Sequence, residues 1–140
     1  IDVTEGKTIE PTIVNGYDGF GGTHDNLLWN ANQGTIVYTL NNKVIKEDTK
    51  TESRLSLLSQ LSDFMHRLDF DGKLCAAAEG ETNPEGNALI YLFETESNKL
   101  INRLTFHQKG VQHLMFANRG QNLISLGVAE ENTLVIWDIY

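Results

Sequence analysis

The feature that most constrains the fold of this chain is a repeat of short runs in which apolar and polar residues alternate. An apolar triplet recurs at one constant offset (111 − 65 = 46), so that Met65, Leu68 and Phe70 match Val111, Leu114 and Phe116. Alternation with period two, broken by turn residues about every eight to twelve residues, predicts β-strands and not helices. Units of four short strands that recur about every 40 to 46 residues are typical of the blades of a β-propeller.

We expect three such units, in residues 16–60, 61–106 and 107–140, after a lead-in segment at 1–15. The expected strands are 26–29, 35–40, 43–47 and 53–58 in the first unit, 64–70, 73–78, 89–93 and 100–106 in the second, and 111–116, 122–126 and 133–138 in the third. A helix over 52–65 is an alternative, because Leu55, Leu58 and Leu61 also have helical spacing.

The last unit ends in the dipeptide Trp137-Asp138, after three strand-like runs separated by turns at 117–120 and 130–132. On these features it resembles a WD40 repeat. The resemblance implies an all-β fold, with about three four-stranded antiparallel units that form blades of a WD40 propeller. Closed propellers have about four to eight blades. We therefore expect the chain to be part of a larger propeller, and its start at Ile1 instead of Met points the same way.

A narrower resemblance rests on the first unit. The runs that carry it are Gly16-Tyr17-Asp18-Gly19, Asn26-Leu27-Leu28-Trp29, Val37-Tyr38-Thr39 and Val44-Ile45-Lys46-Glu47-Asp48. Together they are similar to the opening blade of ciliary, centriolar and microtubule-associated WD40 proteins. The proximal-centriole WD40 family is the nearest of these, with the EMAP-like proteins and the WD40 proteins of the doublet-microtubule lumen as rivals.

This resemblance implies a non-enzymatic scaffold that binds the tubulin lattice or neighbouring ciliary and centriolar proteins, as part of a larger complex. The corresponding location is the cytoplasm, at the cytoskeleton of a cilium, axoneme or centriole. The alternative is a general WD40 protein-interaction hub in signalling or complex assembly, without a cytoskeletal role.

Four polar or aromatic residues of the third unit form one candidate group: His107, Ser125, Glu131 and Trp137. His, Ser and a carboxylate could suggest a hydrolase triad. The WD40 resemblance instead implies a structural hydrogen-bonded network within one blade, in which Glu131 stands where the family usually has Asp. We favour the structural interpretation, because such a network satisfies buried polar groups.

Two loops provide candidate contacts with a partner. Tyr17, Asp18 and Phe20 lie in the glycine-rich segment 16–22, and Glu81 and Glu85 lie in the acidic segment 79–86. The glycine-rich segment lacks the Lys-Ser/Thr ending of a phosphate-binding loop. The acidic segment lacks the spacing of a calcium loop. Docking or solvated loops are therefore the favoured interpretation of both.

Composition limits the remaining classes of function. The net charge of −8 argues against nucleic acid or an anionic membrane surface as a partner, because both require a basic face. Cys75 is the single cysteine, and we expect it in the core of a strand, without a disulfide. No spacing of His and Cys suggests a metal site, and we expect neither a metal nor a cofactor. Trp29 and Trp137 occupy periodic strand positions and are expected in the core.

Overall fold

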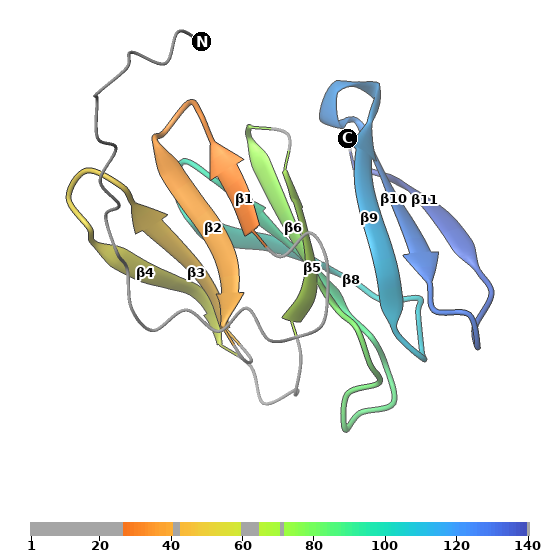
Figure 1. Ribbon diagram of the computed structural model, residues 1–140. Helices are drawn as coiled ribbons and strands as arrows, with labels where there is room; N and C mark the ends of the chain where they lie inside the picture. Colours follow the sequence, from red (N-terminus) through yellow and green to blue (C-terminus); the bar gives the residue numbers. More distant parts are fainter. Residues whose placement is uncertain (1–26, 41–42, 60–64, 71, 140) are drawn as a thin grey trace, which may run out of the picture.

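The computed structural model describes residues 27–40, 43–59, 65–70 and 72–139 as a series of short strands (Figure 1). The elements are β1 (Leu27–Asn30), β2 (Thr35–Leu40), β3 (Lys43–Asp48), β4 (Arg54–Ser59), β5 (Met65–Phe70), β6 (Leu74–Glu79), β7 (Ile90–Glu94), β8 (Lys99–Leu104), β9 (Val111–Ala117), the short 3-10 helix η1 (Asn118–Gly120), β10 (Asn122–Gly127) and β11 (Leu134–Asp138). Within this described part, no helix has the length and apolar character needed to cross a membrane.

The strands form three antiparallel sheets in chain order. The first sheet is β1-β2-β3-β4, the second is β5-β6-β7-β8, and the third contains β9, β10 and β11. The expected strands are confirmed to within one or two residues at most ends. The helical alternative over 52–65 is wrong for Arg54–Ser59, which pairs with β3 as a strand. Leu57 of this strand packs against the apolar cluster between the first and second sheets, so a tertiary contact overrides the helical spacing of the leucines.

The second sheet is covered on both faces, and its strand β6 shows why this is possible. All six residues of β6 are buried. Because side chains alternate across a strand, Cys75 and Ala77 face the first sheet, whereas Ala76 and Ala78 face the third. These small side chains let both neighbouring sheets approach closely. Cys75 is therefore the small core residue that its apolar surroundings predicted.

Larger side chains fill the two interfaces around these small residues. Towards the first sheet, Tyr91 and Phe93 of β7 pack with Val37 and Val44. Towards the third sheet, the cluster contains Ile90, Leu92, Val111 and Leu123, against which Leu114, Phe116 and Trp137 pack. Full burial of one such side chain is worth about 1.5 to 3 kcal/mol. Most of the stability of each sheet therefore depends on the sheet beside it.

The prediction that both tryptophans lie in the core is wrong for Trp29. Trp137 packs into the cluster between the second and third sheets. Trp29, in contrast, is 55% exposed. It is paired with Ile36 on the face of the first sheet that points away from the second, whereas Leu28 contributes to the interface. Among the described residues no further sheet lies on that side.

Strand order places the connections at two opposite rims (Figure 1). We call the end at the top of Figure 1 the upper rim; it contains the turns β1–β2, β3–β4, β7–β8 and β9–β10. The lower rim contains the connections β6–β7, β8–β9 and β10–β11. The second and third sheets approach closely at the lower rim. A Cβ atom on Gly110 would lie 2.2 Å from the carbonyl oxygen of Gly80, so only glycine fits there.

We predict that Gly110→Ala lowers the free energy of unfolding by about 3 kcal/mol, because the added methyl group forces two backbones apart. Gly86→Ala is the matched control, since Gly86 also has a positive φ but no atom within 4 Å of the added Cβ. It should cost only about 1 kcal/mol through backbone strain. Urea unfolding of the protein at its natural length measures both changes. Equal losses in the two variants would contradict the close approach.

Candidate functional site

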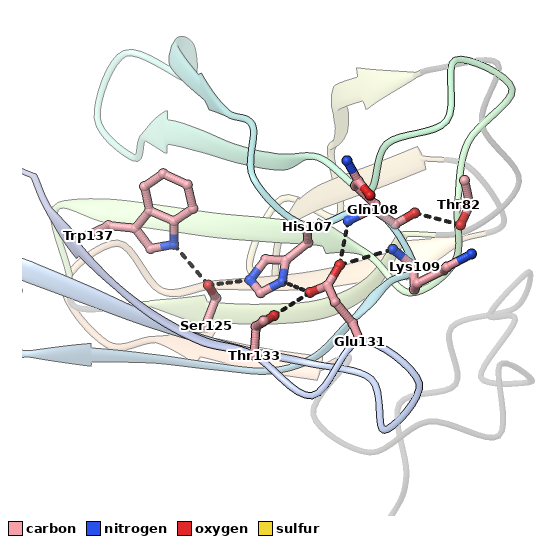
Figure 2. A network of polar contacts seen from close by, with 8 residues as sticks. All are labelled: Thr82, His107, Gln108, Lys109, Ser125, Glu131, Thr133 and Trp137. Carbon is pink, nitrogen blue, oxygen red and sulfur yellow. Dashed lines mark hydrogen bonds and ion pairs between the residues drawn. The ribbon is translucent and has the colours of Figure 1, made fainter.

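His107 is the centre of a chain of polar contacts at the lower rim (Figure 2). Its imidazole ring is completely buried in the connection before β9. The Nε2 atom lies 2.7 Å from Oγ of Ser125 in β10, and the Nδ1 atom contacts the Glu131 carboxylate. Trp137 of β11 donates its indole N–H to Oγ of Ser125 over 2.8 Å. The structure therefore brings together all four residues of the candidate group.

The donors and acceptors define the protonation pattern of a neutral His107. An indole N–H can only donate, so Oγ of Ser125 accepts from Trp137. The serine hydroxyl then donates its own hydrogen to Nε2 of His107. Nδ1 consequently carries the ring hydrogen and donates it to Glu131. In this arrangement each buried polar atom of the three side chains has a partner.

Glu131 accepts hydrogen bonds from side chains and from the backbone. Oε2 accepts from the hydroxyl of Thr133 over 2.6 Å, and Oε1 accepts from the backbone N–H groups of Gln108 and Lys109. Burial alone would raise the pKa of this carboxyl group. The hydrogen bonds from Thr133, His107 and the two backbone groups outweigh burial and lower the pKa from 4.5 to about 2.

Local sequence explains why a glutamate can reach His107. A Cβ atom on Gly127 would lie 2.4 Å from Oε2 of Glu131, so the glycine leaves room for the longer carboxylate side chain. The turn that follows β10 is closed by the N–H groups of Glu131 and Asn132, which both donate to the carbonyl oxygen of Val128. Asn132 has a positive φ of 56°, which asparagine tolerates better than most residues.

The geometry does not suit a serine nucleophile. Ser125 and His107 have no exposed surface, and the serine oxygen already accepts a hydrogen bond from Trp137. The contacts instead join the β8–β9 connection, the strands β10 and β11, and the turn between them. Thr82 extends this link to the second sheet, because its hydroxyl donates to the carbonyl oxygen of Gln108 over 2.6 Å.

Two of the candidate partner-contact residues are described, and both lie in the connection that contains Thr82. Glu81 and Glu85 are exposed in the β6–β7 connection at the lower rim. Tyr17, Asp18 and Phe20 lie outside the residues that the structure describes, as does the lead-in segment 1–15. Within the described residues, no three His, Cys, Asp or Glu side chains are grouped as metal ligands.

Sequence reasoning missed two buried carboxylates. Glu79 accepts a hydrogen bond of 2.8 Å from the hydroxyl of Tyr91, between the first and second sheets. Glu47 accepts one of 3.1 Å from Tyr38 and forms an ion pair with Arg54 at 2.5 Å. Strand parity could have identified Glu79, because it lies two residues after Ala77, on the same buried face of β6.

Comparison with curated proteins finds similarity to cilium and centriole proteins. Cilia- and flagella-associated protein 52 of Chlamydomonas reinhardtii is 32% identical over 132 residues, which are 93% of this chain and 22% of that protein. WD repeat-containing protein 90 of Mus musculus is 25% identical over 125 residues, 89% of this chain and 7% of that protein. Centriole proteome protein 16 of Chlamydomonas reinhardtii is 27% identical, with 89% of this chain and 7% of that protein covered.

The chain thus spans about a fifth of the first relative and less than a tenth of the other two. No protein-family model matches it. The predicted resemblance to ciliary and centriolar WD-repeat proteins is nevertheless confirmed by these relatives.

A solved structure shows the same fold. A propeller chain in the crystal structure of the mitotic checkpoint complex superimposes with a TM-score of 0.66 at 20% identity, over 81% of this chain and 34% of that chain. At this identity the match concerns the fold alone. It confirms that the three sheets are blades of the WD40 propeller type.

We predict that in the Glu131→Gln variant the free energy of unfolding falls less steeply than in the wild type as the pH is lowered from 4.5 towards 2. The pKa of Glu131 in the folded protein is lower than its ordinary value of 4.5, so the carboxylate stabilises the fold above that pH. This contribution is lost as the pH falls from 4.5 towards 2. Denaturant titrations of both proteins over this range should show a steeper decline for the wild type. Parallel declines would contradict the assigned contacts of Glu131.

We also predict that Ser125→Ala lowers the free energy of unfolding by about 2 kcal/mol, because it leaves an imidazole nitrogen and an indole N–H buried without their partner. Ser97→Ala in the exposed β7–β8 turn is the control, and it should change stability by less than about 0.5 kcal/mol. Thermal unfolding of the two variants provides the comparison. A Ser125→Ala variant as stable as the control would refute the proposed structural role of the network.

Proposed function

We propose that the chain forms the blades of a non-catalytic scaffold that docks neighbouring proteins at a cilium, axoneme or centriole. The observation that carries this proposal is its 32% identity, across 93% of its length, with a cilia- and flagella-associated protein. The name of centriole proteome protein 16 supports the same location, and the match to WD repeat-containing protein 90 supports a scaffold of WD repeats. Microtubules are the structure with which such a scaffold would associate.

The burial of the triad-like group His107, Ser125 and Glu131 supports a non-catalytic role. A catalytic serine must reach a substrate and be free to transfer its proton. Ser125 is buried, and its hydroxyl is held between His107 and Trp137. The network instead holds the connections at the lower rim in place. A rim held in this way is a suitable support for docking loops.

The charge of the chain argues for a protein partner between it and the microtubule. Tubulin surfaces are acidic, and this chain has a net charge of −8. Like charges oppose association unless a local contact compensates. The partner is therefore a neighbouring ciliary or centriolar protein with a basic or apolar surface. At the lower rim, Glu81 and Glu85 are the described residues that we assign to such a contact, and the loop residues Tyr17, Asp18 and Phe20 are the others.

We predict that the protein, fluorescently tagged at its natural length in ciliated cells, concentrates at the cilium or centriole. Reversal of charge in Glu81→Lys/Glu85→Lys should reduce this concentration several-fold, because it removes the attraction for a basic partner. The matched control Glu52→Lys/Asp138→Lys reverses two exposed carboxylates in the β3–β4 turn and in β11, and it should have little effect. Fluorescence microscopy measures the enrichment of each variant.

A diffuse distribution of the wild type would overturn the proposal and favour a general interaction hub. Co-sedimentation of the purified protein with microtubules at low salt separates two modes of attachment. Pelleting of the protein alone would show direct tubulin binding, whereas pelleting only with ciliary extract would support an intermediate protein.

A further inference from the structure

We draw no further inference here: the strongest candidate, the exposed apolar face that Met115, Leu134 and Ile136 form on the side of the third sheet away from the second, carries nothing because the described part of the chain does not show what covers it, and a further blade stacked there would only restate the propeller fold.

Discussion

Coverage of the second sheet on both faces is the constraint on which the rest of the structure depends. Strand β6 can lie between two neighbours because its core positions are occupied by Cys75 and three alanines. Phe93 on one side and Leu92 on the other then complete two apolar interfaces. Since a single short sheet buries too little apolar surface to be stable, each blade is stabilised mainly by its neighbours.

Apolar packing holds the sheets together, and polar contacts join them further at each of the two rims. At the lower rim, His107 and Glu131 tie the third sheet to its own turns, and Thr82 links it to the second. At the upper rim, Lys46 and Gln33 join the first sheet to Thr95 of the second. The lower network encloses His107 and Ser125 completely, whereas its Glu131 and Thr133 remain half-buried. Both rims therefore combine contacts that fix the sheets with loops that are exposed to solvent.

This arrangement suits the proposed scaffold, which requires rigid support for its exposed loops and no open catalytic centre. A scaffold needs surfaces whose shape does not change when a partner arrives. Packed blades provide that rigidity, and the loops at their ends provide the polar and charged groups that contact a partner. Similarity to cilium and centriole proteins suggests where such surfaces are used. It does not define which residues contact a partner, because loops vary more than the strands that support them.

The strands were predictable because alternation and turn residues are local signals. The constant offset between Met65 and Val111, and the final Trp137-Asp138, were enough to predict the blades. The grouping of His107, Ser125, Glu131 and Trp137 could also be proposed from the resemblance. The exposure of Trp29 and the burial of Glu47 and Glu79 could not be predicted in this way. Each depends on which face of a strand meets a neighbouring sheet, and that relation involves residues far apart in the chain. Local patterns specify strands and turns, whereas the stacking of sheets determines which polar groups are enclosed and which remain open to a partner.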